Sequence, residues 1–164
     1  MSKSWVINAS PVILLAKAGL IGRVPSLTET FVIPEPVVQE IVGVHGEDAA
    51  ARWLREAGKP FIRPAVVELP ALSGSEIGAG ERSVISWAAA HPGFLAVLDD
   101  HEARVIAQRL GVKVVGTVGV VLRLKQAGLI SEVKSHLQQI KRVGGYISDG
   151  LLREALRRAG ETSD

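Results

Sequence analysis

A short, uninterrupted apolar run, Phe94–Leu98, most constrains what this chain can fold into. A strand that is apolar at every position is buried on both faces, which is typical of a parallel sheet between layers of helices. The helical pattern before it places Glu81 in a first turn, and the run ends directly at Asp99 and Asp100. Ligands bind at the carboxyl ends of strands in open α/β sheets. We therefore expect these three acids to share one rim of the sheet.

The same alternation of strand and helix extends along the whole chain. It predicts one α/β domain over residues 1–160, with a parallel sheet of four or five strands covered on both faces, and a frayed tail at 161–164. The segment 61–72, broken by Pro64 and Pro70, adds an edge strand at most. The predicted strands are 5–7, 31–33, 94–98 and 112–115, and the predicted helices are 12–18, 34–42, 46–57, 81–90, 103–110, 118–127, 131–142 and 148–159.

Composition and charge narrow the function classes. The chain is 47% hydrophobic, enough for a packed core, and it contains no cysteine, which excludes disulfides and thiolate metal sites. The C-terminal part, 112–160, carries nine Lys and Arg against three acids, whereas residues 1–111 carry ten against twelve. An acidic centre beside a basic part would suit a nuclease, which holds a metal ion in one place and a phosphate backbone across the other. Alternatively, the late helices simply present basic faces to solvent.

The N-terminal apolar stretch needs a separate interpretation. Lys3 followed by apolar residues and by Ala16-Lys17-Ala18 has some features of a signal peptide, but Asn8, Ser10 and Pro11 interrupt the apolar part. We interpret it as a strand, a turn and a helix that Ser10 caps, with Pro11 at its first position. No run reaches the ~18 apolar residues of a membrane span. We expect a cytoplasmic protein without a membrane partner.

Four segments are predicted to bring polar side chains to the same rim. Crowded carboxylates repel one another, so such a cluster needs a cation or raised pKa values. Without cysteines or paired histidines, the oxygen ligands indicate a hard cation, Mg²⁺ or Mn²⁺, which could activate a water against a phosphodiester. The alternative for each acid is a structural role, as a helix cap or at the edge of an apolar face. The candidates are Asn8, Glu40, Glu81, Asp99 and Asp100.

Other polar residues are candidates for substrate binding. Arg82 and Arg104 flank the acids and could hold phosphate, or they could neutralise those same acids. Thr117 begins a helix in a turn, 116–119, that resembles a phosphate-binding loop but lacks its full glycine pattern. Close backbone packing is the alternative for this turn.

Taken together, these motifs resemble those of the PIN-domain superfamily. The resemblance rests on the order of the segments 7–11, 34–41, 80–81 and 98–104, and its sharpest part, 111–161, is similar to a branch of VapC-type toxin nucleases. It implies a three-layer α/β/α fold and a Mg²⁺- or Mn²⁺-dependent endoribonuclease, the toxin of a toxin–antitoxin pair. RNA, an antitoxin protein and a second copy in a homodimer are the implied partners.

The resemblance also assigns roles to individual residues. It places the metal-binding and catalytic positions at Asn8, Glu40, Glu81 and Asp100, with Asp99 beside them, and it places Ser10 at the substrate. Asn8 stands where the family typically has aspartate, and Glu81 also replaces a more usual aspartate. An amide oxygen ligates a cation without adding charge, so the sequence leaves open a PIN-like module that binds nucleic acid or protein without cleaving. A nucleotide-binding domain that uses the 116–119 turn is a third alternative.

Overall fold

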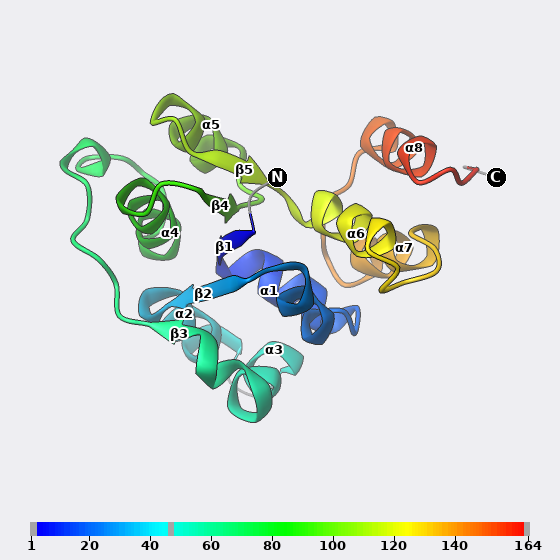
Figure 1. The fold of residues 1–164 in the computed structure, drawn as a ribbon, viewed down its shortest axis with the longest axis horizontal. Coiled ribbons are helices and arrows are strands. Elements are labelled where there is room, and N and C mark those ends of the chain that lie inside the picture. The colour runs from blue at the N-terminus through cyan, green and yellow to red at the C-terminus, as the bar shows by residue number, and fades with distance from the viewer. Residues whose placement is uncertain (1–2, 46–47, 163–164) are drawn as a thin grey trace.

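The computed structural model describes residues 3–45 and 48–162, and its centre is a single five-stranded sheet (Figure 1). All pairings are parallel, in the order β3-β2-β1-β4-β5. Helices flank this sheet in a three-layer α/β/α arrangement, so the predicted fold class is confirmed. The strands are β1 (Ser4–Ile7), β2 (Thr30–Pro34), β3 (Ile62–Arg63), β4 (Phe94–Val97) and β5 (Lys113–Val115).

The helices alternate with the strands up to β5, and three more follow it. Figure 1 shows α7 and α8 beside α6, on the side of the molecule away from α4. There α6 contacts both α7 and α8, and α1 contacts α6 and α7. The α-helices are α1 (Ala9–Lys17), α2 (Glu35–His45), α3 (Ala49–Trp53), α4 (Ala79–Ala90), α5 (His101–Arg109), α6 (Thr117–Gln126), α7 (Lys134–Arg142) and α8 (Asp149–Arg158), and the shorter 3₁₀ or π segments are η1 (Ile21–Leu27), η2 (Leu54–Gly58), η3 (Lys59–Phe61) and η4 (Pro70–Leu72).

The strand order fixes where a ligand site can form. The chain builds outward from β1 through β2 to β3, and then returns to the other side of β1 with β4. Ile7 is in register with Val97. The carboxyl ends of β1 and β4 are therefore neighbours at the point where the strand order reverses, which is the usual place for a ligand in such a sheet.

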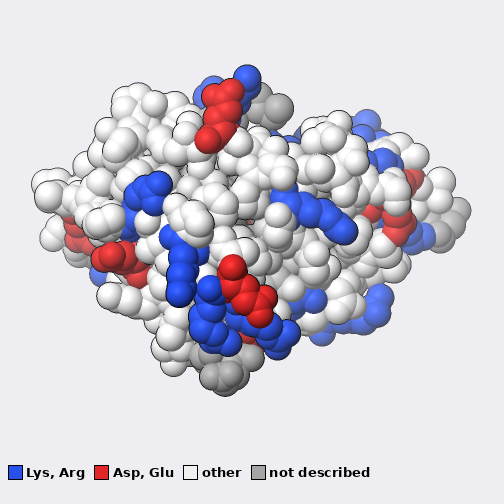
Figure 2. Space-filling view, turned by 60° about the horizontal axis from the view of Figure 1, so that its bottom comes forward, with Lys and Arg blue, Asp and Glu red and all other residues white. Residues whose placement is uncertain are grey.

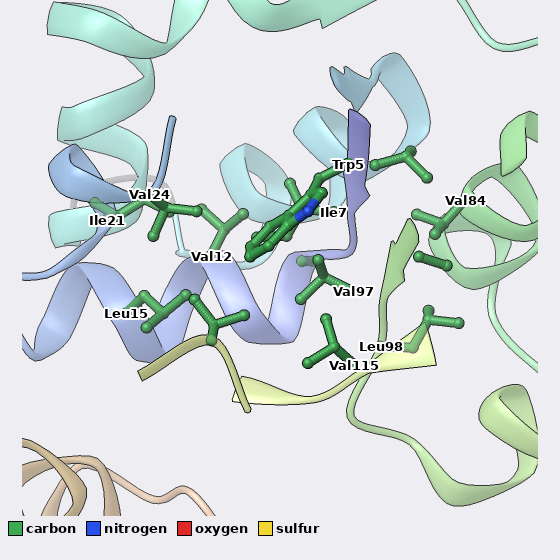
Figure 3. Close-up of a cluster of buried hydrophobic side chains, with 14 of the residues drawn as sticks. Trp5, Ile7, Val12, Leu15, Ile21, Val24, Val84, Val97, Leu98 and Val115 are labelled. Atoms are coloured by element: carbon green, nitrogen blue, oxygen red, sulfur yellow. The ribbon is translucent and has the colours of Figure 1, made fainter. Parts of the chain in front are cut away.

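The core confirms that the central strands are buried on both faces. Trp5, Val6 and Ile7 of β1 are each at most 1% exposed. Figure 3 shows Trp5 and Ile7 among side chains of α1, such as Val12 and Leu15. Burying a large apolar side chain stabilises a fold by about 1.5–3 kcal/mol, so this cluster anchors the rim above it.

The first helix starts earlier than the sequence predicts. Asn8, not Ser10, is its N-cap residue, although its side chain makes no capping hydrogen bond. Pro11 fits inside the first turn because the first four N–H groups of a helix have no partner within the helix. This shift releases the hydroxyl of Ser10, which donates to Asp99 Oδ2 at 3.5 Å.

Other boundaries also differ from expectation. The helix predicted over 46–57 is α3 followed by the π segment η2, with residues 46 and 47 outside the described part of the chain. The helix predicted from 131 begins at Lys134. Glu161, expected to begin a frayed tail, is instead held by Lys125 Nζ at 2.8 Å and by the N–H groups of Val133 at 2.8 Å and Lys134 at 3.0 Å.

Basic side chains are not confined to the C-terminal part. The segment 49–63 carries exposed basic residues as well: Arg52, Arg55, Lys59 and Arg63. Figure 2 shows a face on which Lys and Arg gather around a smaller number of Asp and Glu. Among residues 3–45 and 48–162, no single helix is long and apolar enough to cross a membrane, while α1 and η1, bent by 120°, meet that test only as a pair.

Candidate functional site

A cleft of about 820 Å³ opens at the carboxyl ends of β1 and β4. The N–H of Asn8 donates to Val97 O at 3.1 Å, which joins the two strand ends at its floor. Four of the five predicted catalytic residues line it, and the fifth, Glu40, does not line it but lies near Asn8. The polar residues on this side are Asn8, Ser10, Glu81, Asp99, Asp100 and Arg104.

Asn8 presents an oxygen without a partner. Asn8 is 4% exposed, and its Oδ1 accepts no hydrogen bond within the described residues. A buried amide oxygen without a partner is costly, so such an atom marks a place where a ligand can bind. Helix α4 approaches here through Gly80: a Cβ at that position would lie 3.0 Å from Asn8 Oδ1 and 2.6 Å from Glu40 Oε2. The Asn8 amide and the Glu40 carboxylate are therefore neighbours.

Glu81 faces the same cleft from the first turn of α4. Its Oε2 accepts a hydrogen bond from Gly78 N–H at 2.9 Å, which closes the start of the helix. Burial raises the pKa of Glu81, and although the Gly78 bond acts against this, the charges of Asp100 and Glu40 raise the pKa further. The acids are thus close enough to repel one another, which is the electrostatic condition that a bound cation would relieve.

The two consecutive aspartates have different surroundings. Asp100 is exposed and caps α5, with Oδ2 accepting from Ala103 N–H at 2.9 Å, so its second oxygen remains open to the cleft. Asp99 receives the N–H of Thr117 at 2.7 Å and the Thr117 hydroxyl at 2.6 Å. Through these bonds, Asp99 joins the end of β4 to the start of α6.

Of the residues predicted to bind substrate, some face the cleft and others are used in contacts within the protein. Arg82 is turned away: it pairs with Glu68 at 2.7 Å and donates to Ile77 O, and it does not line the cleft. Thr117 is 3% exposed and its hydroxyl is used by Asp99. Arg104 does line the cleft, and its Nη1 lies 2.7 Å from where a Cβ on Gly116 would be. Gly116 is thus a site of close packing, which favours that alternative for the 116–119 turn.

These donors fit a largely hydrated hard cation better than a closed cage. Within residues 3–45 and 48–162, no three acidic or histidine side chains converge closely enough to hold a metal ion alone. The neutral Oδ1 of Asn8, which is buried and without a partner, supplies a further oxygen beside Glu40. Mg²⁺ commonly keeps several waters and uses only one or two carboxylates. The set of Asn8, Glu40, Glu81 and Asp100 fits that kind of binding.

The sequence predicted a basic part beside the acids, but it did not predict the residues of the opposite wall of the cleft. This wall comes from α6, α7 and α8, and includes Arg123, Tyr146, Leu151 and Arg158. Sequence reasoning also missed Gly80, whose lack of a side chain makes room for Glu40 and Asn8. A glycine in the first turn of a helix was the available signal, because it lowers helix stability unless packing requires it.

Comparison with protein families matches the chain to the family described as DUF3368: PIN domain, over residues 4–161. This range includes both walls of the cleft. Comparisons with curated proteins and with solved structures give no match.

Proposed function

This chain belongs to the PIN-domain family, whose members are generally nucleases that use divalent metal ions, and we propose that it is an endoribonuclease dependent on Mg²⁺ or Mn²⁺. The observation that carries the proposal is the buried Asn8 Oδ1, without a partner, beside Glu40 and near the mutually repelling Glu81 and Asp100. Asn8, Glu40, Glu81 and Asp100 would hold the cation. When bound, it would supply a water of lowered pKa and offset charge on a phosphodiester.

The residues of this chain would then divide the remaining tasks. Arg104 lines the cleft and makes no ion pair within the described residues, so its guanidinium is available for a phosphate oxygen. Asp99, held by Thr117, would fix the end of β4 so that Asp100 keeps its position. Asn8 and Glu40 would contribute oxygens from two other elements. The functional side chains of the site would therefore come from several different elements around the rim.

The finer parts of the proposal concern partners. We propose RNA as the substrate, because members of the family are generally nucleases and basic residues line the cleft. From the resemblance of the C-terminal segment, we also propose that the protein is the toxin of a toxin–antitoxin pair and binds an antitoxin protein. We further propose that it forms a homodimer and acts in the cytoplasm. Light scattering at the mass of one chain would contradict the homodimer.

Cleavage of single-stranded and structured RNA with Mg²⁺ or Mn²⁺ tests the activity. We expect Glu81→Gln and Asp100→Asn to lose most cleavage, because each removes a charge from the proposed cation site. Glu76→Gln, which removes an exposed carboxylate outside the cleft, is the matched control and should cleave like the wild type. Equal cleavage by all four proteins would indicate a contaminating nuclease and contradict the proposal.

A second candidate function follows from Asn8 itself. Its amide brings no negative charge to the rim, which favours a module that binds RNA or protein without cleaving it. If Asn8→Asp creates metal-dependent cleavage that the wild type lacks, this second function is supported. Strong turnover by the wild type would exclude it.

A further inference from the structure

Tyr146 stands at the rim of the cleft, on the wall opposite the acids. It is the only tyrosine of the chain, and its residue is 91% exposed although it lines the same cleft as Asn8, Glu81 and Asp100. An aromatic ring so exposed gains little from the core. Its position therefore needs an explanation other than packing.

The backbone before Tyr146 is fixed by the end of α7. Gly144, at φ +105°, donates its N–H to Lys141 O at 3.2 Å, and Gly145 donates to Ile140 O at 2.9 Å. This pair of bonds is the Schellman arrangement that closes a helix at a glycine. A Cβ on Gly145 would lie 2.6 Å from Ile140 Cγ2 and 3.3 Å from Leu14 Cδ2, so the chain is packed closely against the body of the domain.

The backbone after Tyr146 is fixed as well. Ile147 is 4% exposed and belongs to the core, and Ser148 caps α8 by accepting the N–H of Leu151 at 3.1 Å. Tyr146 is thus the exposed residue between two anchored segments. Because the backbone on both sides of Tyr146 is fixed, binding through its ring costs little backbone freedom, which favours contact with a ligand.

The surroundings of the ring indicate the kind of ligand. Three guanidinium groups, from Arg104, Arg123 and Arg158, line the cleft that separates Tyr146 from the acids. Arg123 donates to Gly119 O at 3.2 Å and Arg158 is paired with Glu154 at 2.9 Å, whereas Arg104 faces the rim where we placed the phosphate. Guanidinium groups for a backbone and an exposed ring for a base are the two components of single-strand recognition.

Resting on the function proposed above, we propose that Tyr146 stacks on an unpaired base of RNA whose backbone crosses the cleft. A base can reach such a ring only outside a duplex. The substrate is accordingly single-stranded or looped RNA, and Tyr146 positions it without taking part in the reaction.

Binding without cleavage tests this assignment. Fluorescence anisotropy in the presence of a chelator measures the Kd of a short single-stranded RNA for the wild type, Tyr146→Ala and Tyr146→Phe. Loss of one stacked base corresponds to a binding loss of about fivefold to a hundredfold, so we expect that range for Tyr146→Ala and recovery by Tyr146→Phe. Val67→Ala, at a position 92% exposed and outside the cleft, is the control and should bind like the wild type.

A second RNA series isolates the stack. Oligonucleotides with an abasic nucleotide at each position in turn should show one position at which the wild type loses as much affinity as Tyr146→Ala does. Tyr146→Ala should lose no further affinity at that position, because the effects of removing the two partners of one contact do not add. Equal loss of affinity at every abasic position, or an unchanged Kd for Tyr146→Ala, would overturn the assignment. It would also be overturned if Tyr146→Ala converted a dimer to a monomer without changing the affinity for RNA.

These outcomes are separable from failure of the nuclease proposal. A wild type that binds RNA through Tyr146 but never cleaves would contradict the catalytic proposal alone. A wild type that cleaves, with Tyr146→Ala binding and cleaving equally well, would contradict the stacking alone.

Discussion

Thr117 donates both its N–H and its hydroxyl to the carboxylate of Asp99, at 2.7 and 2.6 Å. The two residues are 18 positions apart in the chain, and their bonds join the end of β4 to the start of α6. The carboxylate also lies at a helix N-terminus, where the helix dipole stabilises negative charge. Asp99 therefore connects the two walls of the cleft.

We expect Thr117→Val to destabilise the fold by about 1.5–3 kcal/mol, because it removes one hydrogen bond to a charged group while keeping the shape of the side chain. Urea denaturation measures the change in the free energy of unfolding. Thr117→Ser keeps the hydroxyl and should remain within about 1 kcal/mol of the wild type. If Val and Ser behave alike, the hydroxyl bond contributes nothing.

Gly80→Ala should separate stability from function. The added Cβ would meet Glu40 Oε2 at 2.6 Å and Asn8 Oδ1 at 3.0 Å, and the exposed Glu40 can move aside. We expect the thermal midpoint to change little and Mn²⁺ affinity, measured by calorimetry, to fall about tenfold or more as the two oxygens are displaced.

Gly43→Ala provides the matched control for this prediction. It lies within α2, and a Cβ there would meet nothing within 4 Å. It should stabilise the helix by about 0.5–1 kcal/mol and leave Mn²⁺ binding unchanged. Unchanged Mn²⁺ binding in Gly80→Ala would argue against a site between Asn8 and Glu40.

The raised pKa of Glu81 predicts a dependence of stability on pH. The folded state binds the proton of this carboxyl more tightly than the unfolded state, whose pKa is near 4.5, so stability falls as pH rises through this region. In the absence of metal, Glu81→Gln should therefore be at least as stable as the wild type at pH 7, and this advantage should vanish below the unfolded pKa. Denaturation across pH 3–8 measures the free energy of unfolding of both proteins. A difference in this free energy that stays constant with pH would contradict the raised pKa of Glu81.

Glu161 should have the opposite dependence. Burial would raise its pKa, but the bonds from Lys125, Val133 N–H and Lys134 N–H lower it below the ordinary value. Its stabilisation is thus present above the unfolded pKa and lost as pH falls through the lower, folded pKa.

Removing this carboxylate tests the same contact directly. We expect Glu161→Ala to lose about 2–3 kcal/mol at pH 7, because Lys125 and two N–H groups lose their partner. Glu56→Ala, at an exposed position, is the comparison and should change stability by less than about 0.5 kcal/mol. Equal effects would show that Glu161 does not hold the late helices.

The sequence predicted the sheet because its strands are buried on both faces. Runs such as Phe94–Leu98 have no polar position, and this pattern is independent of the order in which strands pair. The positions of Asn8 and Asp99 at one rim followed from the same pattern. The strand order that makes them neighbours did not, because it depends on long-range packing.

The structural role of Asp99 could not be predicted. Two adjacent acids look alike in sequence, and the partner that distinguishes them, Thr117, is distant along the chain. The pairing of Arg82 with Glu68 was not foreseen either, since Glu68 lies in an irregular segment without a periodic pattern. The residues of the far wall were missed because an amphipathic helix reveals its buried face but not the surface that covers it.

The packing of Gly145 against Leu14 brings the last third of the chain onto its first helix. During translation, β1 and α1 emerge before α7 and α8, so Tyr146 and Arg158 reach the cleft after the acids that they face have been synthesised. A growing polypeptide on the ribosome thus carries the acids without the surface that faces them. The cleft therefore has both of its walls only once α8 has been made.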